Sequence, residues 1–472
     1  MKLYRYRNCK RALEEIEKGT FYFASREELN DPIEGHVKIY FQGDQPAWEG
    51  LLRNYVCSLF VCIYRYLVMS PSIDYEHDSL EKILKNIQPH SVIIDIHSFD
   101  DVSMGKILNK LGEDFLNIDS VQKFVNIYGN NAFKCPSKEL RLILRTVHHI
   151  AFNLCLQHFK SRDILRDFPE MKSPGDFPFE IVQNMDSSEW ANWANEAEDS
   201  IADMMEQLTF ITKLQQANFF ANDSVFYNHR QHMTWANIQV NFPKFYVGQL
   251  QDIIYPNAYV VCFSEEPTNS AMWGNYAQNH QGICFIYETQ ICNGQNVIEV
   301  GSRKMQVRRV AYDKKVIEKN FFTSLGRLTL LQIQSWLTGK NGCRSKLLDK
   351  FSDQNIGSWR EQYWDDYIEK FHRKNSAWDH EKEYRILLHD TFLQYDQNEN
   401  RCLKYDPSSL KGVIFGINTS VDDKFNLIRA IHARADRFND VKFFQYEYKE
   451  DTQEIIIREK IYTLNKRLFK MI

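Results

Sequence analysis

The period of the apolar positions changes several times along this chain, and each change predicts a different element. Near the N-terminus, residues 2–6 have the character of a strand, Leu13 and Ile16 have helical spacing ahead of Gly19, and residues 21–24 form a second apolar and aromatic run. This order predicts a strand, a helix and a second strand within the first forty residues.

Between about residues 45 and 222 the apolar positions recur at intervals of three and four, as they do in helices. A loop rich in proline and glycine, residues 168–179, divides this region into two parts. The predicted helices cover residues 51–67, 81–87, 104–116, 121–128, 137–159 and 189–217.

Strand-like sequence returns after this region. Runs at 259–263, 283–287 and 307–312 predict strands, a helical and aromatic-rich segment follows at 316–376, and strands at 413–415 and 441–446 flank a helix at 422–435. We therefore predict an α+β protein in which a mixed β-sheet core carries a large helical insertion. The predicted parts are 1–45 (first part of the core), 46–225 (helical insertion), 226–315 (core continued), 316–376 (second helical insertion) and 377–472 (core completed).

Composition narrows the class of protein. The 472 residues contain 58 Lys and Arg against 62 Asp and Glu, so no global basic field favours nucleic acid, although a local basic groove is compatible with these numbers. Charged residues interrupt the first positions, and the longest apolar stretch, 55–69, is short for a membrane span and contains Arg65. Ten cysteines without a Cys-x-x-Cys pair favour reduced thiols. We expect a cytoplasmic protein without a membrane partner.

The densest chemical signal is a pair of glutamates that opens the apolar run 384–388. In a strand, side chains alternate between the two faces, so Glu381, Glu383 and Arg385 are expected on one face while the apolar residues enter a core. The structural alternative is a charged strand edge that faces water.

Several segments together resemble a bacterial family catalogued as domain of unknown function 2971, over about residues 1–42 and 255–450. The resemblance leaves the helical insertion unexplained. The residues that carry it are 3–7, 21–25, 30–34, 262–264, 272–277 and 279–282, followed by Lys374, Trp378, Glu381, Glu383, Tyr384 and Arg385.

The order of an arginine, a serine and a Glu-x-Glu pair is similar to the pattern of ADP-ribosyltransferases. By this analogy the core is ADP-ribosyltransferase-like and NAD is the cofactor. Cleavage of the bond between nicotinamide and ribose develops positive charge on the sugar, which a fixed carboxylate stabilises. We assign Glu383 to bind the ribose hydroxyl and Glu381 to position or activate the acceptor nucleophile. The reverse assignment stays open.

The same analogy implies the remaining site residues. Arg5 is the candidate for binding the pyrophosphate. The ring of Tyr22, Phe23 or Trp273 is the candidate for stacking on nicotinamide, and His280 is the candidate for a proton shuttle or a phosphate donor. The predicted catalytic residues are Glu383, Glu381 and Arg385, and the predicted cofactor-binding residues are Arg5, Tyr22, Ser25, Ser264, Trp273 and His280.

Each of these residues also has a structural interpretation. Arg5 and Arg7 are able to pair with Asp31 or Glu34, and the turn at Asn30-Asp31-Pro32 commonly binds its own backbone. Trp273 and Tyr276, three apart on a helix, are typical of a core, and His280 is typical of a helix end.

Two further functions remain open. Asp31, Glu34, Glu381 and Glu383 suit a metal-dependent nuclease of a defence system, whereas the helical insertion suits a non-catalytic sensor or assembly module. We predict no bound metal, because the pairs Cys155/His158 and His229/His232 lack further ligands nearby. The favoured expectation is an NAD-cleaving or ADP-ribosyltransferase-like effector in bacterial anti-phage or toxin-type defence. Its partners would be NAD, an unknown nucleic-acid or protein acceptor, and a protein at the insertion.

Overall fold

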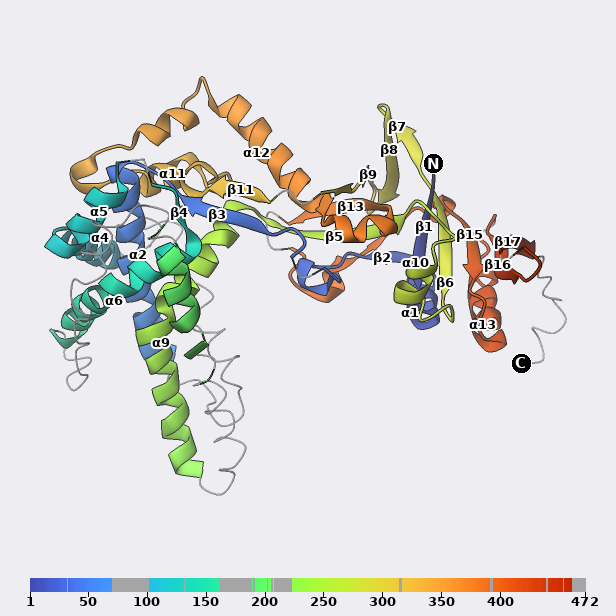
Figure 1. The fold of residues 1–472 in the computed structure, drawn as a ribbon, viewed down its shortest axis with the longest axis horizontal. Helices are drawn as coiled ribbons and strands as arrows, with labels where there is room; N and C mark the ends of the chain where they lie inside the picture. Colours follow the sequence, from blue (N-terminus) through green and yellow to red (C-terminus); the bar gives the residue numbers. More distant parts are fainter. Residues whose placement is uncertain are drawn as a thin grey trace. The chain divides into compact units, whose positions relative to one another are not determined.

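The computed structural model separates into two compact units along the chain (Figure 1). Unit 1 comprises Met1–His36, Pro256–Ile317 and Asp365–Ile472, and unit 2 comprises Val37–Tyr255 and Glu318–Trp364. The structure describes residues 1–31, 33–69, 102–130, 133–161, 189, 192–201, 203–204, 207, 223–313, 316–390, 394–438, 440–452 and 454–460.

Unit 1 is built on a mixed sheet. Among the described residues ten strands form it, in the order β17-β16-β15-β6-β1-β5-β13-β9-β8-β7, antiparallel except where β15 runs parallel to β16. The strands are β1 (Lys2–Arg7), β5 (Asn257–Ser264), β6 (Ile283–Glu288), β7 (Gln290–Cys292), β8 (Gln295–Val300), β9 (Arg303–Arg309), β13 (Glu383–Asp390), β15 (Leu410–Phe415), β16 (Lys442–Lys449) and β17 (Glu454–Lys460).

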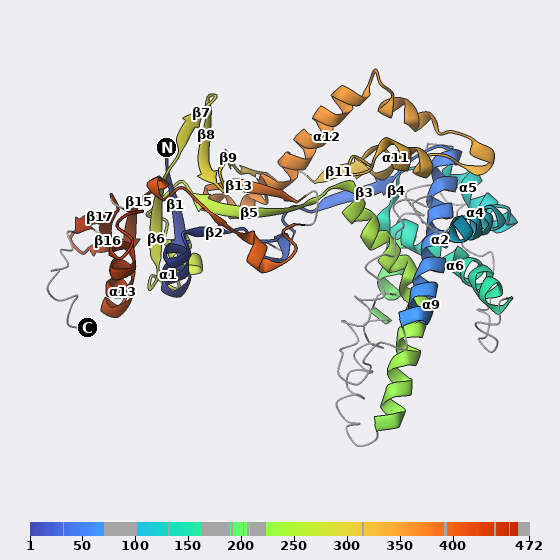
Figure 2. The ribbon, with the colours of Figure 1, turned by 180° about the vertical axis from the view of Figure 1, so that it is seen from behind.

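Helices cover both faces of this sheet. Helices α1 (Cys9–Lys18) and α13 (Val421–His432) pack beside each other on one face, as Figures 1 and 2 show from opposite sides. Helix α10 (Ser270–Tyr276) packs on the other face, where Trp273 meets Tyr6 edge to face. Each face of the sheet is therefore apolar, and polar side chains within it need partners of their own.

Smaller elements complete unit 1. Strand β2 (Thr20–Tyr22) pairs with β14 (Cys402–Lys404), and β10 (Ala311–Tyr312) pairs with β12 (Arg373–Lys374). The 3₁₀ helices are η1 (Arg26–Glu28), η6 (Ser376–Glu381), η7 (Asn398–Arg401) and η8 (Pro407–Ser409).

An opening in the sheet sets the position of the candidate site. Within the described strands, the pairing of β1 with β5 is confined to Tyr4 opposite Ser264. Further back along β5, Val260 exchanges two backbone hydrogen bonds with Ala24 instead. Because backbone groups alternate between the two edges of a strand, those of Cys262 point the same way as those of Val260, between β1 and the segment at Ala24.

Unit 2 is mainly helical. Its elements include β3 (Val37–Phe41), α2 (Gln45–Met69), α4 (Val102–Leu116), α5 (Asp119–Tyr128), β4 (Cys135–Pro136), α6 (Ser137–Lys160), α9 (Asp223–Ile254), β11 (Ile317–Asn320), η3 (Phe321–Thr323), α11 (Leu330–Trp336), η4 (Lys340–Gly342) and η5 (Lys346–Phe351). Helix α12 (Ile356–Phe371) follows along the chain. In unit 2, Trp48 packs against Phe124, Tyr128 and Phe322 in an aromatic core.

The α+β class and the mixed sheet are confirmed. The helices expected at 51–67, 104–116, 121–128 and 137–159 correspond to α2, α4, α5 and α6, while 81–87, 168–179 and much of 189–217 lie outside the described residues. Residues 226–254, expected in the core, instead form part of helix α9 in unit 2. The helical pattern of the apolar positions is weak around Pro243, so the sequence did not predict this helix. Within the described part of the chain, none of the helices has the length and apolarity of a membrane span.

Candidate functional site

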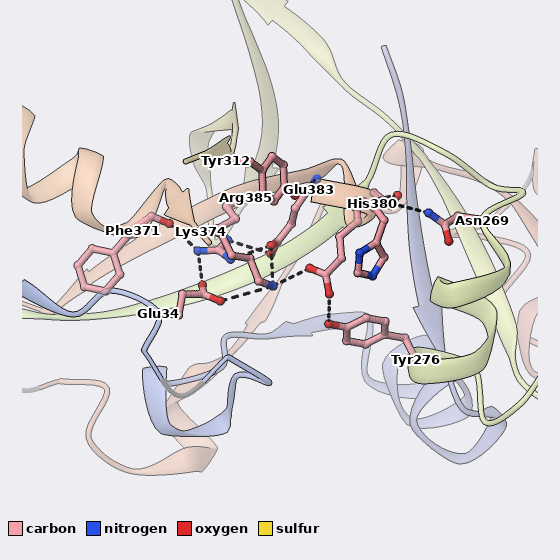
Figure 3. Close-up of polar contacts among 11 residues, drawn as sticks. Glu34, Asn269, Tyr276, Tyr312, Phe371, Lys374, His380, Glu383 and Arg385 are labelled. Atoms are coloured by element: carbon pink, nitrogen blue, oxygen red, sulfur yellow. Dashed lines mark hydrogen bonds and ion pairs between the residues drawn. The ribbon is translucent and has the colours of Figure 1, made fainter. Parts of the chain in front are cut away.

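The paired glutamates converge on one lysine, although they come from different elements. Glu383 begins β13, whereas Glu381 ends η6, and Lys382 between them has a left-handed backbone with φ of 45°. Lys374 Nζ lies 2.6 Å from Glu381 Oε2 and 3.4 Å from Glu383 Oε2 (Figure 3). Glu381 therefore lies outside the strand, and its orientation is set by the turn at Lys382 and not by the alternation of a strand. Both carboxylates still point to the same cation.

Arg385 fixes the second carboxylate. Its Nε and Nη2 bind the two oxygens of Glu383 at 2.8 and 2.7 Å, and its Nη1 binds the carbonyl of Phe371 at 2.7 Å. The same Nη1 forms an ion pair with Glu34, whose other oxygen lies 3.5 Å from Lys374 Nζ. The guanidinium is thus occupied by protein groups, so Arg385, which also lines the cavity, positions Glu383.

Burial and charge act in opposite directions on these carboxyl groups. Burial raises the pKa of Glu383, but the charge of Arg385 and its hydrogen bonds outweigh burial and lower that pKa to about 2. Burial, with the charge of Glu383, raises the pKa of Glu34 despite Arg385 and Lys374. Burial lowers the pKa of Lys374, but the neighbouring carboxylates, with Glu383 contributing most, raise it overall. At neutral pH Glu383 is therefore a fixed anion beside a protonated lysine.

Three neighbours hold Glu381 and the start of β13. The Tyr276 hydroxyl donates to Glu381 Oε1 at 2.6 Å, and the Ser264 hydroxyl donates to the Glu381 carbonyl at 2.8 Å. The Glu383 N–H donates to the Tyr312 hydroxyl at 2.8 Å. These contacts leave acceptor capacity on Glu381, since a carboxylate offers about four lone-pair sites.

A cavity of about 300 Å³ opens onto this cluster. Its lining includes Glu381, Glu383 and Lys374 on one side, Arg5 from β1, and Cys262 and Ser264 from β5, so it occupies the opening between β1 and the segment at Ala24. Arg5, Ser264 and Glu383 therefore line one concave space. Its volume lies at the lower end of the roughly 300–1,000 Å³ typical of ligand pockets.

A second charged group lies on the β1 side of this cavity. Arg5 Nε and Arg7 Nε approach the same Glu15 oxygen, at 3.4 and 3.3 Å. The Arg5 guanidinium is also sandwiched near the rings of Phe21 and Phe263, at 5.1 and 5.6 Å. The expected alternative partners, Asp31 and Glu34, are not the acids that Arg5 and Arg7 meet in the described structure.

Of the four other residues predicted to bind the cofactor, one lines the cavity and three do not. Tyr22 lines the cavity, and its hydroxyl donates to Glu28 at 2.7 Å. Ser25 caps η1, where its N–H donates to Glu28 Oε2, so its role is structural. Trp273 is fully buried and donates to the Pro267 carbonyl, and His280 stacks on Trp273. Neither Trp273 nor His280 lines the cavity in the described structure, because α10 directs Trp273 into the core and His280, in the turn after α10, stacks on Trp273.

Sequence reasoning missed the residues that join the cluster together. The sequence indicates Lys374 and Tyr276 only as parts of motifs or of a core, and Glu34 only as a metal ligand or as a partner of Arg5 and Arg7. The sequence carries one signal for these residues. Lys374 lies seven residues before Glu381, and an ordered turn precedes Glu34, so both charges stand beside features that the sequence already indicates. The expectation for Asp31 is confirmed, as its Oδ1 accepts from the Ile33 N–H at 3.1 Å.

Comparison with known proteins gives one family match over part of the chain and no activity. Residues 272–386 match the model of a family described as protein of unknown function (DUF2971). The matched segment runs from α10 to β13 and contains Tyr276, Lys374, Glu381, Glu383 and Arg385, which confirms the resemblance seen in the sequence. No curated protein and no solved structure matches the chain.

Proposed function

We propose that unit 1 cleaves the bond between ribose and nicotinamide in NAD, as an ADP-ribosyltransferase-like or NAD-cleaving effector of bacterial defence. The observation that carries this proposal is the cavity that has buried carboxylates paired with a lysine on one side and arginines on the other. A ligand that becomes cationic at one end and carries phosphate at the other is complementary to that distribution.

The contacts favour separate roles for the two glutamates. Glu383 accepts from Arg385 twice and from Lys374 once, and the Cys262 thiol also hydrogen-bonds to it, so a ribose hydroxyl binds Glu383 by replacing this thiol. Glu381 accepts from Tyr276 and Lys374, so it keeps about two sites and orients the nucleophile. When the glycosidic bond breaks, its electron pair leaves with nicotinamide, the nucleophile's oxygen bonds to the ribose carbon, and its proton passes to Glu381.

The nuclease alternative is less well supported. A divalent cation between Glu34, Glu381 and Glu383 would occupy the position of the Lys374 ammonium, which all three carboxylates already approach. Displacing a buried lysine from three acids costs more than filling a prepared metal site.

The first test is release of nicotinamide from NAD by the purified protein. We expect wild type and the exposed control Asp379→Asn to release it, Glu383→Gln to be inactive, and a chelator to have no effect. Binding of NAD should also raise the melting temperature. A chelator-sensitive cut in DNA or RNA, without nicotinamide release, would instead establish the nuclease.

A further inference from the structure

Another cavity adjoins the one at the glutamates. It has a volume of about 400 Å³ and shares Arg7, Arg11, Tyr22 and Glu28 with the first cavity. Beyond these shared residues its lining includes Lys18, Thr20, Glu399 and Cys402, which do not line the first cavity. These four common lining residues, Arg7, Arg11, Tyr22 and Glu28, mark the boundary between the two spaces.

Three guanidinium groups, from Arg5, Arg7 and Arg11, lie near this boundary, together with the acids Glu15 and Glu28, of which Glu28 is already paired with Arg401. Arg5 and Arg7 share a single Glu15 oxygen, and the other oxygen of Glu15 accepts from the Tyr287 hydroxyl at 2.8 Å. Arg5 is only 1% exposed, and its Nη1 has no hydrogen-bond partner in the described structure. A buried guanidinium with an unused donor, in a pair that shares one carboxylate, is stabilised when an anion enters.

A like-charge effect between the arginines agrees with this geometry. Burial, followed by the charge of Arg5, lowers the pKa of Arg7 to about 10 against the opposing effect of Glu15. The exposed Arg11 on α1 adds a third guanidinium to the lining of both cavities.

The succession of groups matches a dinucleotide better than a mononucleotide. From one end to the other, the lining offers carboxylates for a ribose, arginines for an anion, and a further space with Tyr22 at its entrance. A dinucleotide has the same order of nucleoside, pyrophosphate and nucleoside, whereas a mononucleotide would leave the larger cavity empty. Tyr22 offers an aromatic face and Glu399 an acceptor for a ribose hydroxyl.

We propose that the adjoining cavity binds the second nucleoside of a dinucleotide whose pyrophosphate lies beside Arg7 and Arg11. This inference rests on the proposed function for the position of the first ribose, and it concerns binding, not bond cleavage.

The test compares the dissociation constants of NAD, nicotinamide mononucleotide and nicotinamide riboside by calorimetry. Wild type should bind NAD at least tenfold more tightly than the mononucleotide. Thr20→Trp, which fills the adjoining cavity, should remove that advantage and leave mononucleotide binding unchanged. Arg11→Glu should weaken NAD tenfold or more without affecting the riboside, whereas Lys10→Glu, at an exposed position on the same helix, should change neither.

The outcomes separate this inference from the proposed function. Equal affinity for NAD and the mononucleotide, or an equal loss of both in Thr20→Trp, would overturn the inference even if nicotinamide is released. Tight NAD binding that depends on Arg11 but is followed by no release would leave the inference standing and refute the proposed reaction. Because Arg11 is on the surface, its variant keeps the test valid if Thr20→Trp does not fold.

Discussion

At the scale of single residues, the decisive feature is that Lys374 serves three carboxylates while buried. Its side chain is 4% exposed, and those of Glu34, Glu381 and Glu383 are 2–5% exposed. Charges that are removed from water depend on their partners, so the loss of one member leaves the others uncompensated. The same burial is what makes these acids suitable for stabilising a transient cation.

Lys374→Met should therefore lower the free energy of unfolding by about 3–5 kcal/mol, as expected when one partner of a buried ion pair is removed. Lys382→Met is the matched control, because Lys382 pairs with Glu266 at the surface and such pairs contribute about 0–1 kcal/mol. Urea titration measures both values. Similar losses in the two variants would show that Lys374 is not a central member of the cluster.

The pH dependence of unfolding distinguishes Glu383 from Glu34. Because the pKa of Glu383 falls from 4.5 to about 2 on folding, its ionised form stabilises the protein above pH 4.5, and this contribution is lost as the pH falls to about 2. The destabilisation caused by Glu383→Gln should accordingly shrink on acidification. Glu34 has a raised pKa, so ionising it costs stability as the pH rises above 4.5, and the cost of Glu34→Gln should shrink in that direction. Parallel profiles for the two variants would contradict this account.

At the scale of elements, the site depends on how β1, β5 and β13 are joined. The register places Glu383 opposite Ser264 and Arg385 opposite Cys262, and β1 reaches β5 at Ser264. Alternation in the sequence correctly predicted that Glu383 and Arg385 share a face, because β13 is regular from Glu383 onward. The left-handed turn at Lys382 has no such periodic signal.

Long-range pairing explains why periodicity in the sequence could not place Arg5, which only the analogy assigned to the site. The partners of Glu383 include Lys374 and Arg385 nearby, but the cavity also needs Arg5, which lies far away in the chain and meets the site only through sheet order. The analogy gave Trp273 and His280 to the ligand, whereas their helical spacing and helix-end position indicated structural roles, and the structure packs Trp273 in the core with His280 stacked on it.

A glycine directly before β6 tests the packing of β1. A Cβ at Gly282 would lie 2.2 Å from the Arg7 carbonyl and 2.9 Å from Ala277, so Gly282→Ala should destabilise the protein and displace Arg7. Gly274 in α10 has open space around it, and Gly274→Ala should be neutral or stabilising by up to about 1 kcal/mol. Thermal melting compares the pair, and equal melting temperatures would refute the packing argument.

At the scale of the whole molecule, each unit has a core of its own. Unit 1 contains the sheet with its two apolar faces, and unit 2 contains the aromatic cluster around Trp48. Segments distant in sequence contribute to each unit, so sequence order alone did not reveal which helical parts belong together. A partner surface on the helical insertion remains a prediction.

Separate cores predict separable responses to mutation. Trp48→Ala should cost about 3–5 kcal/mol, as the loss of a large buried ring does, and should increase hydrogen exchange mainly in unit 2. Lys374→Met should increase exchange mainly in unit 1. Hydrogen exchange of the full chain, followed by mass spectrometry, locates both effects, and a uniform increase across the chain would contradict independent cores.

The most direct measurement of the central claim is the rate of nicotinamide release from NAD by wild type, Glu381→Gln and Glu383→Gln, each shown to be folded. We predict release by wild type, with a loss of at least a hundredfold in each variant while NAD still binds. Undiminished release in both variants, or no release by a wild-type protein that binds NAD, would contradict the role given to the paired carboxylates.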